Sequence, residues 1–161
     1  MLMLNDNKWI GHYRLYKDEE AVKPLSRGGV TVFARQLGHT AAFKVGIAVC
    51  SLQDQYCRYK GRAIAGGRSL ALGEAMTYFT ITIPTNLFDK TDVEQFDWFR
   101  ACMKSKADQA LYRVLTNLYT KHVAQITKPF EASGVSVVSP NMLIMYNLRR
   151  FHRSARARTS S

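Results

Sequence analysis

Cysteine is scarce in this chain, and its spacing argues against the usual structural uses of that residue. The three cysteines are Cys50, Cys57 and Cys102. An odd number at wide spacing does not suit a disulfide framework. No C-x-x-C pair is present and the four histidines are scattered, so no zinc or other metal site is expected. We expect reduced thiols, as is usual in a cytoplasmic protein.

Long apolar runs are absent as well. The longest purely apolar stretches are a few residues, whereas a helix that crosses a bilayer needs about 20. The start of the chain, residues 1–6, lacks the charged and apolar regions of a signal peptide. The only bulky apolar residue in the tail, residues 149–161, is Phe151, too little for an interfacial helix. We therefore expect a cytoplasmic protein without a membrane partner.

Acidic residues are few, and this shortage is the most prominent feature of the composition. Against 23 Lys and Arg there are 12 Asp and Glu, so the formal net charge is +11 at pH 7. Such an excess favours a polyanionic partner, which could be a nucleic acid or an acidic protein surface. Hydrophobic residues make up 47% of the 161 residues, which is enough for a packed core in one domain.

Segments rich in aromatic and β-branched residues predict the strands of a sheet. The four strongest are residues 8–16, 30–37, 41–50 and 76–83, and a weaker one follows at 135–139. The connector between the second and third segments is short. We therefore expect these two strands to form an antiparallel hairpin.

A first helix is predicted over residues 53–72. Ser51 would cap it, and Asp54 would lie in its first turn, where a carboxylate is favourable. Each glycine inside a helix costs about 1 kcal/mol relative to alanine, and this segment holds three, Gly61, Gly66 and Gly67. Two explanations stay open: close approach of another backbone or of a ligand, or a break near Gly66-Gly67.

The second helix, over residues 92–126, has the clearer pattern. Residues 91–94, Thr-Asp-Val-Glu, match a capping box. Apolar residues then recur at three- and four-residue steps. The length exceeds that of an average helix, so a break near residues 104–106 is possible. A short helix over residues 142–152 could follow.

Together these segments predict an α+β fold. We expect a mostly antiparallel sheet of about four strands, packed against two helices that cover one of its faces. The sequence shows no internal repeat and no interdomain linker. The predicted organisation is one domain over residues 1–148 and a flexible, arginine-rich tail over residues 149–161.

The tail carries positive charge without local compensation. No acidic residue follows Glu131. Such a block is typical of an interaction tail that neutralises phosphates, although a solvated solubility tail has the same composition. Its arginines are Arg149, Arg150, Arg153, Arg156 and Arg158.

Residues 53–68 form a second basic segment, and this one also contains aromatic residues and glycines. Cations can hold phosphates while aromatic rings stack on unpaired bases, a combination typical of single-strand binding. The alternative is that the tyrosines pack in the core and the cations are simply solvated. The candidate binding residues are Tyr56, Arg58, Tyr59, Lys60, Arg62 and Arg68.

Catalytic signatures are missing. Neither a P-loop nor a dinucleotide-binding glycine motif occurs, so no cofactor is expected. Cys50 ends a predicted strand before a predicted helix, where a thiol is easily activated. It would need His12 or His39 as a base, and no spacing rule supports either pairing. We therefore expect no enzymatic activity.

A resemblance covers this same corner of the chain. The stretch Val45-Gly-Ile-Ala-Val-Cys50 is followed by Asp54, Tyr56, Arg58, Gly61-Arg62, Ala65 and Gly67-Arg68. About 25 residues thus resemble a pattern in small basic proteins of bacteriophages. The resemblance implies a mobile-element origin and a bacterial host cytoplasm, and it carries no activity with it.

The leading interpretation is a non-enzymatic nucleic-acid-binding protein with a preference for single strands of DNA or RNA. The alternative is a phage effector that binds and inhibits a host protein through its basic face. The sequence leaves the choice between DNA and RNA, sequence specificity and oligomeric state open.

Overall fold

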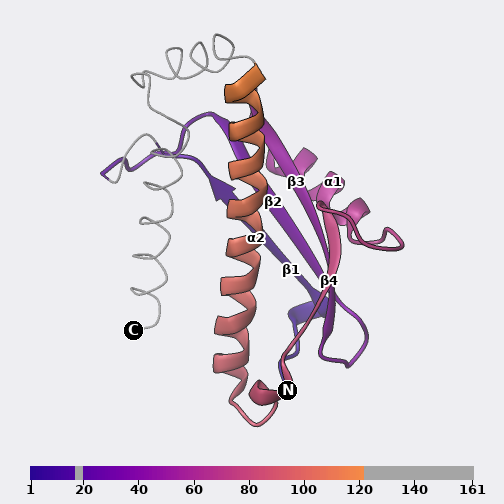
Figure 1. Ribbon diagram of the computed structural model, residues 1–161. Coiled ribbons are helices and arrows are strands. Elements are labelled where there is room, and N and C mark those ends of the chain that lie inside the picture. Colours follow the sequence, from indigo (N-terminus) through magenta and orange to yellow (C-terminus); the bar gives the residue numbers. More distant parts are fainter. Residues whose placement is uncertain (17–19, 122–161) are drawn as a thin grey trace. The chain divides into compact units, whose positions relative to one another are not determined.

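The computed structural model describes residues 1–16 and 20–121 of the chain (Figure 1). The expected strand at 135–139, the helix at 142–152 and the arginine-rich tail lie outside the described residues. In chain order the elements are η1 (Asn5–Asn7), β1 (Lys8–Arg14), β2 (Arg27–Gln36), β3 (Ala42–Gln55), α1 (Arg58–Arg68), β4 (Tyr78–Thr82), η2 (Thr85–Leu87) and α2 (Asp92–Lys121).

The strands form one antiparallel sheet in the order β1-β2-β3-β4. This confirms the predicted α+β class and the pairing of the second and third strands. The backbone N–H of Leu37 donates to the carbonyl of Ala42 at 2.9 Å and closes the β2–β3 hairpin. Strand β4 pairs antiparallel with β3, with Val45 opposite Phe79. Strands that follow one another along the chain are thus neighbours in space, as short connections favour.

The chain divides into two compact units. The first comprises Met1–Tyr13, Val30–Val49 and Cys57–Ala110. Of the described residues, the second comprises residues 14–16, 20–29, 50–56 and 111–121. Within the second unit, the N–H of Leu25 donates to the carbonyl of Leu15 at 2.7 Å, and both side chains are buried.

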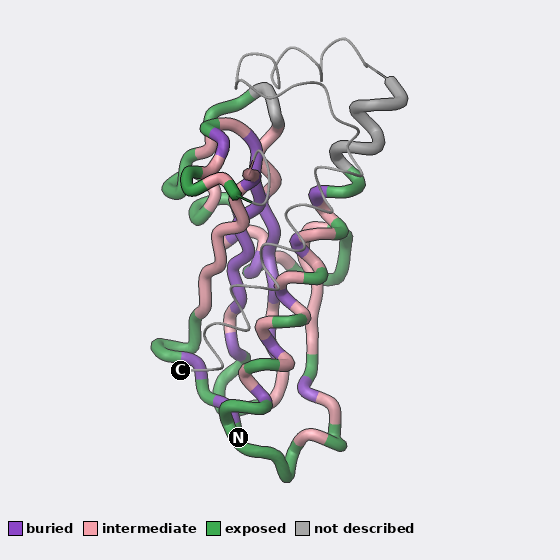
Figure 2. The backbone as a smooth tube through the Cα atoms, turned by 90° about the vertical axis from the view of Figure 1, so that its left-hand side faces the viewer, coloured by how far each residue is buried: buried purple, intermediate pink, exposed green. Residues whose placement is uncertain are grey.

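Helix α2 covers one face of the sheet in the first unit. Side chains alternate between the two faces of a strand, and on β3 the buried Phe43, Val45 and Ile47 point to the α2 side. The ring of Phe43 lies 4.9 Å from that of Phe99 on α2, measured between centroids. Trp9 of β1 meets the same Phe99 ring edge-on at 5.4 Å. Figure 2 shows this core as buried stretches of the strands and one buried side of the helix.

Helix α1 covers the opposite face, on which Phe33, Ala48 and Ala65 form a smaller buried cluster with Ile10 beside it. The expectation that both helices share one face is therefore wrong. The reason lies in β2, whose residues from Gly28 to Ala34 are all buried. A strand that is apolar on both faces needs a cover on each side.

Gly61 of α1 is explained by the close approach of the helix to the sheet. A Cβ at Gly61 would meet the side chain of Thr31 on β2, and a Cβ at Gly46 of β3 would meet the backbone oxygen of Ala65. The helix runs unbroken from Arg58 to Arg68. Of the two explanations left open by the sequence, close approach holds at Gly61, where the neighbour is the side chain of Thr31, and a break near Gly66-Gly67 is wrong.

The predicted start of α1 is also wrong. Strand β3 extends to Gln55, so neither Ser51 nor Asp54 belongs to a helix, and the N-cap is Cys57. The backbone N–H of Tyr56 donates to the carbonyl of Ser26 at 2.9 Å. Strand-like pairing therefore persists where the polar sequence suggested a first helical turn, because partner strands can override local propensity.

Helix α2 begins as predicted. The hydroxyl of Thr91 accepts a hydrogen bond from the N–H of Glu94 at 3.2 Å, which is the N-cap half of a capping box. No break occurs near residues 104–106, where Lys104 and Asp108 form an ion pair of 3.2 Å along the helix. The helix is described to Lys121, and residues 122–126 of the predicted helix lie outside the described residues.

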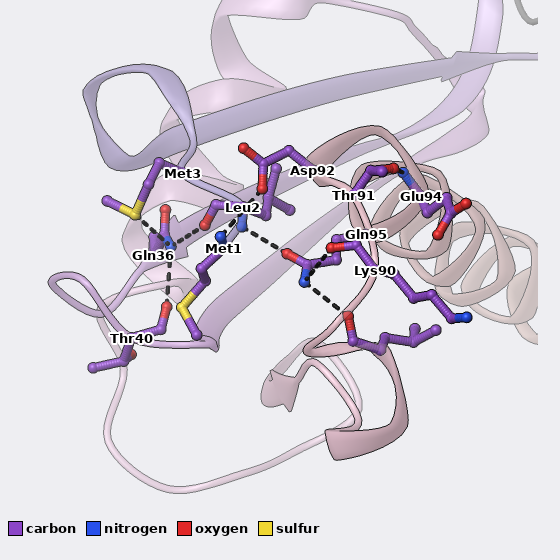
Figure 3. Close-up of polar contacts among 11 residues, drawn as sticks. Met1, Leu2, Met3, Gln36, Thr40, Lys90, Thr91, Asp92, Glu94 and Gln95 are labelled. Atoms are coloured by element: carbon purple, nitrogen blue, oxygen red, sulfur yellow. Dashed lines mark hydrogen bonds and ion pairs between the residues drawn. The ribbon is translucent and has the colours of Figure 1, made fainter.

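Two buried glutamines tie the first residues of the chain to this framework (Figure 3). Gln36 accepts a hydrogen bond from the N–H of Leu4 at 2.8 Å and donates to the carbonyls of Leu2 and Thr40 at 2.9 and 3.0 Å. Gln95 of α2 accepts from the N–H of Leu2 at 2.7 Å. Each amide thus satisfies backbone groups that would otherwise be buried without partners.

Candidate nucleic-acid interface

Helix α1 presents cations to solvent. Arg58, Lys60 and Arg62 are all exposed. Over the described residues, no carboxylate forms an ion pair with any of them. The helix contains no acidic residue of its own. Its positive charge is therefore available to an external anion.

Tyr59 stands among these cations and is 83% exposed. Large aromatic side chains are usually at least half buried, because each can remove about 150–250 Å² from water. The alternative that the tyrosines of this segment pack in the core therefore does not hold for Tyr59. An exposed ring beside cations offers a stacking surface.

Tyr56, the other tyrosine predicted for stacking, has a different environment. It precedes α1 and is half-buried. The guanidinium carbon of Arg14 lies 4.4 Å from the centroid of its ring, which is a cation–π contact. One face of Tyr56 is therefore occupied within the protein, and Tyr59 is the better placed of the two rings.

Arg68 differs from the other cations of the helix. It is half-buried, and its Nη1 donates to the backbone carbonyl of Ile47 at 2.5 Å. A cation in the last helical turn also interacts favourably with the helix dipole. The hydroxyl of Ser69 bonds the carbonyl of Gly66 at 2.6 Å and closes the same end. Arg68 thus anchors α1 to β3 and positions the exposed cations.

Two cations of the sheet lie on the same face as α1, and the sequence interpretation did not include them. They are Arg35 on β2 and Lys44 on β3, and both are half-buried. Alternation places Arg35 on the side of Phe33, and Lys44 on the side of Gly46, which faces α1. The alternation of side chains along a strand, combined with the register of the β2–β3 hairpin, would have identified this pair from the sequence.

Exposed apolar side chains follow α1 along the chain. Leu70, Leu72 and Met76 are 65%, 96% and 61% exposed. Their segment is held in place, since Lys44 Nζ donates to the carbonyl of Gly73 at 2.6 Å and Ala75 N–H donates to the carbonyl of Tyr78 at 2.7 Å. Exposed apolar groups on an ordered segment are typical of protein interaction sites.

The environment of Cys50 does not match the predicted strand-to-helix junction. Cys50 lies inside β3, which continues for five residues, so it is not at the N-terminus of a helix. The strand-to-helix junction at which a thiol could be activated is therefore not at Cys50. Its Sγ lies 3.5 Å from the carbonyl oxygens of Asp54 and Gln55. Cys102 on α2 is half-buried, and burial raises the pKa of its thiol against the opposing effect of Lys106.

The ionisation of Tyr13 on β1 is perturbed by its surroundings. Burial raises the pKa of its hydroxyl well above the ordinary value, Asp108 adds to the rise, and Arg100 opposes it. The neutral phenol is thus favoured in the folded state. This group faces the α2 side of the sheet and is separate from the basic face of α1.

Comparisons with known proteins leave the function to be argued from the structure. No protein-family model, no curated protein and no solved structure matches this chain. In the described part of the chain, no three His, Cys, Asp or Glu residues gather as metal ligands would. No helix among the described residues is long and apolar enough to span a membrane. The five tail arginines lie outside the described residues.

Proposed function

We propose that this protein binds single-stranded nucleic acid through α1 and catalyses no reaction. The observation that carries the proposal is Tyr59, an aromatic ring 83% exposed between exposed cations on one short helix. Stacking on such a ring needs an unpaired base, because the bases of a duplex already stack on one another. The preference for single strands follows from this requirement.

The binding mode assigns separate roles to the side chains of the helix. Arg58, Lys60 and Arg62 neutralise phosphates of the strand while one base stacks on Tyr59. Neutralised phosphates release counterions, so affinity falls as salt rises. The arginine-rich tail adds attraction that is independent of base sequence. The resemblance to small phage proteins supports a role on phage nucleic acid in the cytoplasm of a bacterial host.

A titration of fluorescently labelled oligonucleotides tests this proposal. Single-stranded and duplex DNA and RNA are compared at two salt concentrations. We expect tighter binding of single strands and a loss of about 1–3 kcal/mol on Tyr59→Ala, the range measured for one stacked base. Tyr59→Phe keeps the ring and should bind normally. Phe88→Ala removes an aromatic residue that is 47% exposed, outside α1, and is the matched control.

Two results would contradict the proposal. The first is the absence of binding to any oligonucleotide at low salt. The second is equal affinity of the Tyr59→Ala and Phe88→Ala variants for a single strand, which would remove the stacking role and leave a general electrostatic attraction.

A second candidate is a phage effector that docks on a host protein, and the 96% exposure of Leu72 favours it. Exposed leucine next to a basic helix suits an apolar pocket with an acidic rim. A pull-down from nuclease-treated bacterial lysate, repeated with Leu72→Asp, separates the candidates. A stoichiometric protein that survives nuclease and is lost with Leu72→Asp supports the effector. Recovery only without nuclease supports nucleic-acid binding.

A further inference from the structure

Arg35 and Lys44 are cross-strand neighbours on the sheet. The hydrogen bond from Leu37 N–H to the carbonyl of Ala42 fixes the β2–β3 register. In this register Leu37 lies opposite Ala42. Arg35 therefore lies opposite Lys44, two residues further from the turn on each strand. Lys44 is in turn opposite Thr80 of β4. A row of two cations and one hydroxyl therefore crosses three strands on the face that α1 partly covers.

This pair of like charges is not balanced by the described part of the protein. Lys44 Nζ donates to the carbonyl of Gly73 at 2.6 Å. The guanidinium carbon of Arg35 lies 5.1 Å from the centroid of the Phe33 ring, and its buried Nε has no hydrogen-bond partner among the described residues. Like charges directly opposite one another destabilise a sheet. An oxyanion bound between them would relieve the repulsion and accept charge-assisted hydrogen bonds.

The pair also continues the basic face of α1. Tyr59, Arg62 and Gly66 are spaced by three and four residues and lie along one side of the helix. A Cβ at Gly66 would lie 3.4 Å from the ring of Phe33, which is the ring that Arg35 covers. The side of α1 that carries Tyr59 and Arg62 therefore leads onto the sheet at Arg35.

We propose that Arg35 and Lys44 form a phosphate-binding site on the sheet, with the hydroxyl of Thr80 as a further donor. The site binds a backbone phosphate of the same strand whose base stacks on Tyr59, so the inference rests on the proposed function. The strand then follows a path from α1 onto β2 and β3. The ligand class is a phosphate oxyanion with its negative charge on non-bridging oxygens.

The test compares two double variants that remove the same charge. Arg35→Gln with Lys44→Gln removes the proposed site. Lys90→Gln with Lys104→Gln is the control. Lys90 lies just before α2 and Lys104 lies on it, away from the face of α1. Circular dichroism and thermal melting verify that both fold. Affinity for a labelled single-stranded oligonucleotide is measured across a salt series.

We expect the Arg35/Lys44 variant to lose about tenfold in affinity for each charged contact removed. The slope of log affinity against log salt should become shallower by about 0.7, because the site neutralises one phosphate and each neutralised phosphate of a single strand contributes about 0.7. Arg35→Lys keeps the charge and should retain most of the binding. The control should lose little affinity and keep its slope.

The outcomes separate this inference from the function on which it rests. Wild-type binding with equal affinities of the two double variants overturns the sheet site and leaves the function of α1 intact. Absence of wild-type binding overturns both. Inorganic phosphate, added as a competitor at constant ionic strength, tests whether the site binds free phosphate instead of a backbone phosphate. One outcome is that free phosphate raises the melting temperature of the wild type but not that of the Arg35/Lys44 variant, while both proteins bind the oligonucleotide equally well. In that outcome the site is not part of the path of the strand, and the proposal fails.

Discussion

Substituting alanine for the glycines of α1 tests how closely this helix approaches the sheet. Gly61 and Gly67 both lie inside the helix, so alanine should favour the helical backbone at either position by about 1 kcal/mol. Only their surroundings differ. A Cβ at Gly67 would meet nothing within 4 Å, whereas a Cβ at Gly61 would meet Thr31, whose own Cβ is 3.0 Å away.

The neighbour of Gly61 cannot easily move aside. Thr31 is 1% exposed, and its hydroxyl lies 3.1 Å from Nδ1 of His12. Rotation of the Thr31 side chain would break that contact, so the helix must shift instead. Overpacking of this kind costs about 1–3 kcal/mol. After the propensity gain, we expect Gly61→Ala to destabilise the fold by up to about 2 kcal/mol and Gly67→Ala to stabilise it by up to about 1 kcal/mol.

Urea unfolding followed by circular dichroism measures both variants. A double variant, Gly61→Ala with Thr31→Ala, removes the opposing hydroxyl and should recover part of the loss, giving a coupling energy between the two sites. In thermal melts, each kcal/mol corresponds to a shift of about 2–4 °C for a chain of this size. If Gly61→Ala is as stable as Gly67→Ala, α1 does not pack against β2 as described, and the position of the candidate interface on the sheet must be reconsidered.

Two further predictions concern the framework of the first unit. Gln36→Ala should destabilise the fold by about 3 kcal/mol, since it leaves the buried Leu4 N–H and the carbonyls of Leu2 and Thr40 without their Gln36 partner. Urea unfolding measures this loss, with Gln109→Ala at an exposed position as the control. Equal stability of the two variants would contradict the prediction. The raised pKa of Tyr13 should stabilise the fold fully below pH about 10, the ordinary tyrosine value, and this stabilisation should be lost as pH rises further. Stability measured from pH 8 upward should therefore fall less steeply in Tyr13→Phe, and parallel curves for the two proteins would refute this origin.

Several features of this protein follow from the sequence alone. Segments rich in aromatic and β-branched residues predicted all four described strands, because such side chains suit the pleated surface of a sheet. The Thr91–Glu94 pattern located the start of α2, because the cap is a contact between residues three apart. The charge excess and the cations of α1 could also be taken from composition and order, since neither depends on distant contacts.

Other features were decided by contacts between residues far apart in sequence. The start of α1 moved to Arg58 because β3 continues its pairing to Gln55. The helices lie on opposite faces because both sides of β2 are buried. Arg68 is an anchor, and Tyr59 rather than Tyr56 is the exposed ring, because Ile47 and Arg14 supply partners that local sequence does not specify.

The basic face changed most between sequence and structure. A run of cations along one helix is visible in the sequence, and it predicted an electrostatic surface. The pairing of Arg35 with Lys44 depends on the hairpin register, and their continuity with α1 depends on the packing of Gly66 against Phe33. Charge is a property of the chain, but the distance between charges is a property of the fold, because only tertiary packing places side chains from β2, β3 and α1 on one surface.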